Sequence, residues 1–328
     1  MTDRRNIDAK RVIEHCRMMW RIRAFEENAL KGLDEKIVLG AIHPSIGQEA
    51  VAAGICANLR RDDVLLSTHR GHGHTLAKGA DPEAMMRELF GKEGGNCGGK
   101  GGSMHIADFG VGMLGANGVV SANIVIAAGA GHGIKLRGED KVVCCIFGDG
   151  AINRGPFLEG LNWAVVFNLP VLFVCEDNGF AATTRTKTMT GGDGPSARAR
   201  ALGVPSVEID GNDVLAVDGA ARELIGTIRA GGGPRFLHAH TYRLTGHTGA
   251  DPATYRPKEE VEARWKDDPI ARAAALVEAQ AGEIEKARAA AYDEMSRIFE
   301  IAKAAAFPPA EFAFTDVQDA GDPRQGAF

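Results

Sequence analysis

The segment KVVCCIFGDGA, residues 141–151, joins an apolar run to a polar end. Its six apolar residues (142–147) pass directly into Gly-Asp-Gly-Ala. An apolar run of this length is typical of a strand that is buried on both faces of a parallel sheet. Ligands of such sheets bind beyond the carboxyl ends of the strands, so Asp149 is a candidate functional residue.

The chain on both sides of this segment alternates predicted strands and helices. Strands are predicted at 64–67, 142–147, 171–177, 204–211 and 235–243. Helices are predicted at 8–33, 47–59, 81–91, 121–138, 155–168, 197–203 and 213–231. This order predicts an α/β fold, a doubly wound parallel sheet with helices on both faces. We assign residues 1–257 to this domain and 258–328 to a C-terminal extension. The extension has helices that break at Asp268-Pro269 and an extended tail from Pro308.

The composition argues against several classes of protein. The 328 residues carry a net charge of −5 and contain no dense block of Lys and Arg, so no nucleic-acid surface is expected. No apolar run reaches the ~18 residues of a membrane span, and the N-terminus lacks the apolar core of a signal peptide. None of the six cysteines forms a C-x-x-C pair, which favours buried, reduced thiols. We therefore expect a cytoplasmic protein that binds neither nucleic acid nor membrane.

Residues 91–118 are rich in glycine and lack clear periodicity, which predicts a long functional loop. GGNCGGKG at 94–101 mimics a P-loop, but Gly101 stands where the magnesium-binding hydroxyl would be. Gly110, Gly112 and Gly115 form a dinucleotide fingerprint that no predicted strand precedes. A nicotinamide-dependent dehydrogenase is therefore only an alternative.

Three histidines lie in HRGHGH at 69–74, a segment predicted to be a loop. Imidazoles at this spacing can bind a metal ion. Arg70 would repel a cation, however, and Arg beside His suits an anion such as phosphate. The two readings that stay open are a phosphate site and a solvated loop.

Asp149 has a counterpart at the end of the next predicted strand, where Asp177-Asn178 follow the GDG triplet after 26 residues. Neighbouring strand ends lie about 5 Å apart, so these oxygen atoms are predicted to converge. Hard oxygen ligands suit Mg²⁺ that is shared with phosphate groups. The amides of Gly150 and Ala151, at the start of the predicted following helix, can receive those phosphates. The alternative is a turn in which Asp149 only caps a helix.

The GDG triplet followed by Asp177-Asn178 resembles the thiamine diphosphate-binding motif. From about residue 15 to 270 the chain resembles the α subunit of the decarboxylating first component of 2-oxo acid dehydrogenase complexes, which act on pyruvate, branched-chain 2-oxo acids or acetoin. The stretches that carry the resemblance are IHPSIGQEAV (42–51), STHRGHGHTLAKG (67–79), GGKGGSMHIAD (98–108), GANGVV (115–120), FGDGAINRG (147–155) and TYRLTGHTGADPATYR (241–256).

The resemblance implies a site for Mg²⁺ and thiamine diphosphate. Asp149, Asn178 and the carbonyl group of Phe180 match the metal ligands of the family. The cofactor-binding positions, which include two of these ligands, are matched by His69, Arg70, Gly118, Val120, Asp149, Gly150, Ala151, Asn178 and His247. His72 and His247 match active-site histidines, which implies catalytic roles in proton transfer.

The resemblance also implies a reaction and partners. The bound cofactor attacks the keto carbon of a small 2-oxo acid, CO₂ leaves, and the acyl group passes to a lipoyl group on a separate acyltransferase component. This chain offers one doubly wound domain, so a separate β subunit is expected to complete the cofactor site in a heterotetramer. Little activity is expected without it.

The chain departs from the family pattern at two places. Asp177 stands where Asn is usual, and Ile152-Asn153-Arg154 replaces a small residue followed by Asn-Gln. GANGVV resembles the acetoin branch, whereas residues 241–256 resemble the pyruvate and branched-chain branch. We expect a pyruvate-type substrate, with an acetoin dehydrogenase α subunit as the alternative. A non-catalytic assembly subunit is a further alternative.

Overall fold

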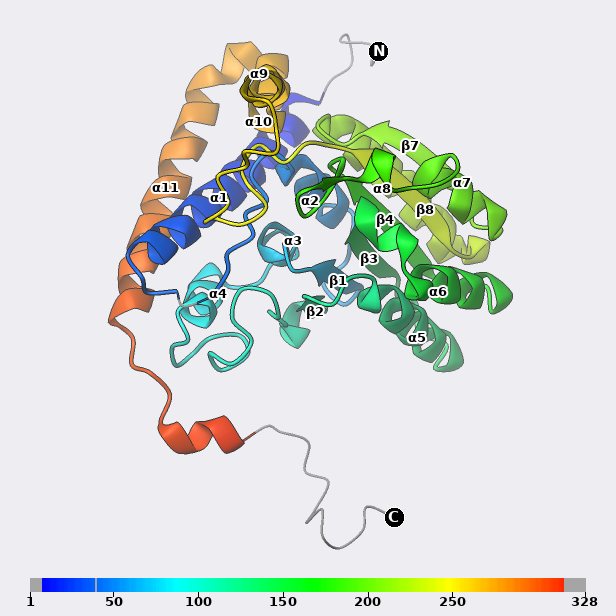
Figure 1. The fold of residues 1–328 in the computed structure, drawn as a ribbon, viewed down its shortest axis with the longest axis horizontal. Coiled ribbons are helices and arrows are strands. Elements are labelled where there is room, and N and C mark those ends of the chain that lie inside the picture. The colour runs from blue at the N-terminus through cyan, green and yellow to red at the C-terminus, as the bar shows by residue number, and fades with distance from the viewer. Residues whose placement is uncertain (1–7, 39, 316–328) are drawn as a thin grey trace, which may run out of the picture.

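The computed structural model describes residues 8–38 and 40–315 of the chain (Figure 1). Its centre is a six-stranded sheet in which every neighbouring pair is parallel. In spatial order the strands are β2 (Met113–Asn117), β1 (Val64–Thr68), β3 (Val143–Gly148), β4 (Val171–Asp177), β8 (Arg235–His240) and β7 (Ser206–Asp210). The chain leaves β1 toward β2 on one side and continues with β3 on the other. The order therefore reverses between β1 and β3, where parallel sheets form their ligand crevice.

Alternate side chains of each central strand enter two separate hydrophobic cores, because successive residues of a strand point to opposite faces. Cys144 and Val174 belong to one core, and Cys145 and Phe173 belong to the other. The first core is covered by α1 (Ala9–Asp34), α2 (Glu49–Cys56), α3 (His72–Ala77), α4 (Pro82–Leu89), α8 (Val214–Thr227) and α11 (Ala281–Ala304). The second is covered by α5 (Ala122–Leu136), α6 (Gly155–Val166) and α7 (Gly194–Ala201). The predicted doubly wound α/β fold is confirmed.

The C-terminal region is more interrupted than the single predicted break at Asp268-Pro269. It contains α9 (Lys258–Arg264), a 3₁₀ turn, α10 (Pro269–Ala274) and a second 3₁₀ segment (Ala275–Gln280) in which Val277 leaves helical geometry. The long α11 then runs beside α1, where Met295 and Phe299 are buried (Figure 1). The domain boundary at residue 257 stays a prediction, because α11 shares a core with the sheet domain.

Two elements lie in segments that the sequence predicted to be loops. β2 lies inside the glycine-rich segment 91–118, and its only apolar residues are Met113, Leu114 and Ala116. α3 begins at His72, inside HRGHGH, and has only six residues. The two loop predictions were wrong because glycine and histidine have low helix and strand propensities. Tertiary packing against neighbouring elements stabilises α3 and β2 despite these low propensities.

Smaller features complete the fold. β5 (Phe180–Ala181) and β6 (Thr184–Arg185) form a short hairpin beyond β4. A 3₁₀ turn at Ala310–Phe314 follows α11, and most of the extended tail that was predicted from Pro308 lies outside the described residues. The six cysteines are free, and all but Cys97 are buried, as predicted. In the part of the chain that the structure describes, no helix has the length and apolar character that a membrane span requires.

Candidate active site

A cavity of about 350 Å³ lies at the carboxyl ends of β1, β2, β3 and β4. It therefore occupies the position at which the strand order reverses. Most of the site residues that were predicted from the sequence line it. They are His69, Arg70, Gly118, Val120, Asp149, Gly150, Ala151, Asn178, Phe180 and His247. His72 is the predicted residue that does not line the cavity.

Asp149 and Asp177 are neighbours across two strands. Gly148 of β3 is paired with Glu176 of β4, so the residues that follow, Asp149 and Asp177, face one another. Burial, and then the charge of Asp177, raise the pKa of Asp149 to about 7. Thr186 donates a hydrogen bond to the Asp149 carboxylate, and no Lys or Arg among the described residues forms an ion pair with it. The buried Asp149 carboxylate, which lines the cavity, therefore fits a small divalent cation.

Asn178 is held in a fixed orientation at the same place. Its amide nitrogen donates to Gln48 Oε1 at 3.2 Å, and its Oδ1 accepts from the backbone N–H of Phe180 at 3.1 Å. Gln48 Nε2 is buried without a hydrogen-bond partner. Asp149 and Asn178 therefore line the same cavity, as their spacing in the sequence predicted, and their role as metal ligands stays a prediction.

The turn after β3 differs from the prediction that Gly150 and Ala151 open a long helix. They belong to a short 3₁₀ helix, Asp149–Asn153, and α6 begins later, at Gly155. A Cβ atom at Gly150 would lie 2.7 Å from the Cβ of Ala181, so only glycine fits against the hairpin here. The backbone of this turn is thereby kept close to the cavity.

Ile152, Asn153 and Arg154, where the sequence leaves the family pattern, do not line this cavity. Arg198 donates to the carbonyl of Ile152 at 2.8 Å and to Asn153 Oδ1 at 2.7 Å. These contacts tie the turn to α7.

Two buried guanidinium groups give the cavity positive charge. Arg70 donates to the carbonyl of Pro44 and, at 3.2 Å, to the carbonyl of His247. Arg243 donates to the carbonyl of Ala182 at 3.1 Å and to the hydroxyl of Tyr255 at 2.8 Å. Within residues 8–38 and 40–315, neither guanidinium has a carboxylate at ion-pair distance. Buried cations without a carboxylate partner fit an anion, and their planar donors suit a diphosphate.

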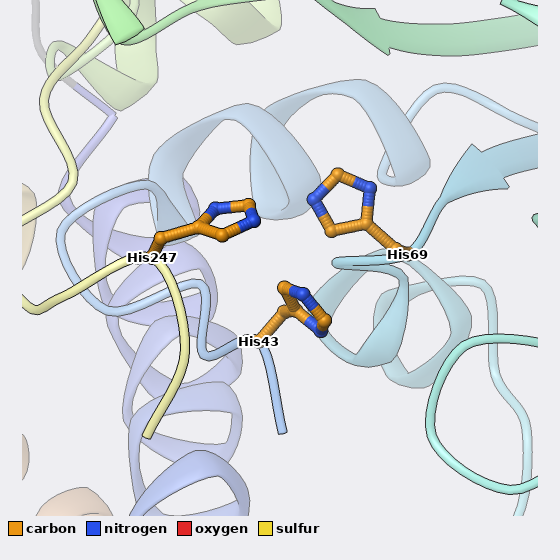
Figure 2. A group of neighbouring side chains, drawn as sticks. All are labelled: His43, His69 and His247. Atoms are coloured by element: carbon orange, nitrogen blue, oxygen red, sulfur yellow. The ribbon is translucent and has the colours of Figure 1, made fainter. Parts of the chain in front are cut away.

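Three histidine rings converge between these guanidinium groups. Figure 2 shows His43, His69 and His247 pointing toward one another from three separate segments. Their ring centroids are separated by 4.6 Å (His43–His69), 4.9 Å (His43–His247) and 5.5 Å (His69–His247). His247 Nδ1 lies 3.2 Å from a nitrogen of Arg243 and 3.4 Å from one of Arg70.

Burial and the neighbouring positive charges keep these rings neutral. Burial first, and then Arg70, lower the pKa of His43 to about 3, that of His69 to about 2 and that of His247 to about 4. The ring nitrogens lie close enough to hold a metal ion, but two adjacent guanidinium groups would repel it. The cluster is better suited to form hydrogen bonds as neutral imidazoles beside an anion.

The three histidines of HRGHGH diverge rather than form one metal site. His69 faces the cavity, and His74 Nδ1 lies 2.8 Å from Ser67 Oγ. His72 is fully buried, with Nδ1 2.8 Å from Glu26 Oε2 and Nε2 2.9 Å from Ser103 Oγ. His72 thus joins α1, α3 and the glycine-rich loop, and its predicted catalytic role stays a prediction.

Replacing His72 by alanine is expected to destabilise the fold, because it leaves the buried Glu26 carboxylate without its imidazole partner. Although burial raises the pKa of Glu26, His72 and Ser45 hold it below its ordinary value. Removing one partner of such a buried pair lowers the free energy of unfolding by about 3–5 kcal/mol. Urea unfolding of His72→Ala would measure the loss, with His132→Ala as a control outside this network. Equal free energies of unfolding for wild type and His72→Ala would contradict the prediction.

The raised pKa of Asp149 predicts that Mg²⁺ affinity depends on pH. A metal ligand must be deprotonated, so affinity should increase as pH rises toward about 7 and then level off. Asp177→Asn removes the neighbouring charge, lowers the pKa of Asp149 and should move this inflection to lower pH. Calorimetric titration with Mg²⁺ at several pH values would measure both curves. Identical pH profiles for the two proteins would show that Asp177 does not control Asp149.

Sequence reasoning missed four residues of the site: His43, Arg243, Glu176 and Thr186. Glu176 lines the cavity with Oε1 unbonded, and His74 Nε2 lies 3.5 Å from that oxygen. His43 and Arg243 lie inside two stretches that carry the family resemblance, 42–51 and 241–256, and that signal could have identified them. No sequence motif around Thr186 indicates a site residue, because its position beside Asp149 depends on the hairpin after β4.

Comparison with known proteins identifies the family and several relatives of the chain. The family described as "Dehydrogenase E1 component" matches residues 17–310. The chain is 48% identical over 242 residues to the alpha subunit of acetoin:2,6-dichlorophenolindophenol oxidoreductase from Bacillus subtilis, a match that covers 74% of this chain and 73% of that protein. It is 45% identical over 256 residues to the same subunit from Cupriavidus necator, covering 78% of this chain and 77% of that protein. The pyruvate dehydrogenase E1 component subunit alpha of Zymomonas mobilis is 40% identical over 270 residues, covering 81% and 76%.

Proposed function

Because this chain belongs to the dehydrogenase E1 component family, we propose that it is the α subunit of a 2-oxo acid dehydrogenase that requires thiamine diphosphate and Mg²⁺. We propose a pyruvate-type 2-oxo acid as the substrate. The observation that carries the proposal is one cavity that is lined by Asp149 and Asn178 and by the guanidinium groups of Arg70 and Arg243, which form no ion pair with a carboxylate of the described residues. This arrangement supports a metal ion shared with a diphosphate.

The residues of the cavity divide into two binding groups. Asp149, Asn178 and the carbonyl of Phe180 would hold Mg²⁺. Arg70 and the amides of Gly150 and Ala151 would hold the diphosphate, with Gly118 and Val120 next to the aminopyrimidine half. When bound, thiamine diphosphate supplies the electron sink that makes loss of CO₂ from a 2-oxo acid possible.

The histidines of the cavity supply neutral imidazoles at neutral pH. Arg70 and Arg243 both direct guanidinium nitrogens at His247 Nδ1, so the unprotonated ring is favoured and its Nε2–H can donate to a reacting group in the proton transfer that we propose. His43 and His69 are held neutral in the same way and can accept hydrogen bonds from substrate. If His247→Ala retained full turnover, the proposed proton transfer by this residue would be wrong.

A β subunit would complete the site. The described residues form one parallel sheet and one short hairpin, and these carry the residues that we propose to hold the metal ion and the diphosphate. At the mouth of the cavity, Val119 is 65% exposed and Val120 is 49% exposed, which suits contact with a partner. We propose a heterotetramer whose β chains complete the aminopyrimidine pocket, with a lipoyl-bearing acyltransferase as the acceptor of the acyl group.

Acetoin is the second candidate substrate. It is favoured by the 48% and 45% identity to subunits that are named for acetoin.

Calorimetric titration with thiamine diphosphate and Mg²⁺, with and without the β subunit, tests the proposal. We expect tight binding and decarboxylation only with both chains, and the substrate is then identified from a panel of 2-oxo acids and acetoin. Decarboxylation by the lone chain at full rate would refute the need for a β subunit. Binding of a nicotinamide cofactor in place of thiamine diphosphate would refute the function itself.

A further inference from the structure

A second cluster of ligand-type side chains lies outside the cavity, at the carboxyl ends of β4, β7 and β8. The strand register pairs Asp177 with His240, and Glu208 with His238. These positions are on one face of the sheet, because residues two apart in a strand point the same way. The cluster thus continues the surface that α7 covers, and nothing in the proposed function uses it.

The inner atoms of this cluster converge on one point. Asp177 Oδ2 lies 2.8 Å from His238 Nε2 and 3.8 Å from His240 Nδ1. These three ligand-type atoms all lie within 4.8 Å of one another. Two ligands of a tetrahedral zinc ion are separated by about 3.3 Å, given bonds of about 2.0–2.2 Å. The two distances from Asp177 lie on either side of that value, so small side-chain movements would admit an ion.

The outer nitrogens of both imidazoles already face acceptors. His238 Nδ1 lies 3.2 Å from Ser196 Oγ and 3.7 Å from Glu208 Oε2. His240 Nε2 lies 3.4 Å from the same Glu208 oxygen. An N–H directed at an outer carboxylate leaves the opposite nitrogen as a free electron pair, which is how metal-binding histidines are oriented. His238 Nε2–H donates to Asp177 at 2.8 Å, so a bound ion would replace that proton, which would pass to Nδ1 beside Ser196 Oγ. His240 keeps its Nε2–H directed at Glu208, which leaves Nδ1 free to bind the ion.

The cluster is accessible, and its surroundings do not oppose a cation. His240 is 52% exposed at its side chain and borders a hollow of about 500 Å³ that Asp177 also lines. The arginines around the hollow are paired: Arg272 with Asp210 at 2.7 Å, and Arg185 with Glu260. Arg200 is the cation beside the cluster, at 3.8 Å from Glu208 Oε1. The other carboxylate oxygen of Glu208, Oε2, faces His238 and His240.

We propose that His238, His240 and Asp177 bind a divalent transition metal ion of the zinc class, with Glu208 as the residue that orients both imidazoles. Two imidazoles and one carboxylate suit late first-row metals, whereas Mg²⁺ prefers oxygen ligands. Three protein ligands leave a coordination position open toward the hollow, where water or a carboxylate ligand can bind. Because Asp177 also faces Asp149, this ion would lie next to the proposed Mg²⁺ site.

The full chain, assembled with its β subunit, stripped of metals and then saturated with Mg²⁺ and thiamine diphosphate, is titrated calorimetrically with Zn²⁺. We expect one Zn²⁺ per chain, with affinity about 100-fold weaker in His240→Ala and about tenfold weaker in Glu208→Gln. Because His240 is half-exposed, its replacement should not disturb the fold, and thermal unfolding checks this. His132→Ala, a histidine on α5, is the matched control and should bind Zn²⁺ as the wild type does.

Co²⁺ in place of Zn²⁺ should give visible absorption bands in the wild type that are absent from His238→Ala. An Asp149→Asn chain without cofactor is a second background, so the result does not depend on the proposed function. Zn²⁺ affinity that is the same in His240→Ala and wild type, or wild-type binding that disappears once Mg²⁺ and cofactor fill the cavity, would overturn the proposal.

Discussion

Replacing Asp149 by asparagine is expected to remove Mg²⁺-dependent cofactor binding and with it the activity of the assembled enzyme. The change deletes the negative charge that faces the proposed metal while it preserves the size of the side chain. Interactions with a charged group contribute about 3 kcal/mol, which corresponds to a loss of roughly 100-fold in affinity. Titration of the variant with thiamine diphosphate at fixed Mg²⁺ would measure this loss.

The same variant should be no less stable than the wild type. Burial and Asp177 raise the pKa of Asp149 above its value in the unfolded chain, so the folded state binds the extra proton between about pH 4 and pH 7. Stability therefore falls as pH rises through this window, and asparagine avoids that cost. Asp210→Asn, which changes a carboxylate at the end of β7 outside the cavity, is the matched control for cofactor affinity. A variant that loses both binding and stability would indicate that Asp149 is mainly structural.

Arg70→Ala is expected to have an effect of similar or larger size on the cofactor. Arg70 is 4% exposed, and although burial lowers its pKa to about 10, it remains protonated at neutral pH. Losing two charge-assisted hydrogen bonds to phosphate costs about 3–5 kcal/mol, a decrease of roughly 100-fold to 1,000-fold or more in affinity. The dissociation constant for thiamine diphosphate in the presence of the β subunit is the quantity to measure.

Arg70→Lys separates charge from geometry in this prediction. Lysine keeps the positive charge but cannot donate two parallel bonds, so we expect an intermediate loss of affinity. Binding to Arg70→Ala that equals wild-type binding would move the diphosphate away from Arg70 and toward Arg243. The guanidinium of Arg243 lines the same cavity and is equally buried.

The fold was largely predictable because its central strands are apolar on both faces. The predicted strand 171–177 has the same bounds as β4. The predicted strand 142–147 lies one residue before β3, which runs from Val143 to Gly148. β2 was missed because an edge strand needs only one paired neighbour and tolerates glycine. The interruption at Val277 was missed because alanine-rich sequence favours a continuous helix, and the break depends on packing against α1 and α2.

The site was predictable where it follows strand ends and unpredictable where it depends on loops. The spacing of Asp149 and Asn178 was enough to place them together, since adjacent parallel strands bring their ends to one edge. His43 and Arg243 are separated by 200 positions in the sequence, and no local pattern relates them. The fold brings both to His247. His72 lies outside the cavity with both ring nitrogens bonded, a position that its sequence motif did not reveal, and its catalytic role stays a prediction.

The paired guanidinium groups of Arg70 and Arg243 have a consequence for the choice of buffer. Inorganic phosphate, sulfate and pyrophosphate share the geometry of the group that these residues suit, so they should compete with thiamine diphosphate for the cavity. An anion present at ten times its dissociation constant would stabilise the chain by about 1.4 kcal/mol and weaken the apparent affinity for cofactor about elevenfold. Affinities measured in phosphate and in zwitterionic buffers are therefore expected to differ, and storage in phosphate should protect the chain against heat.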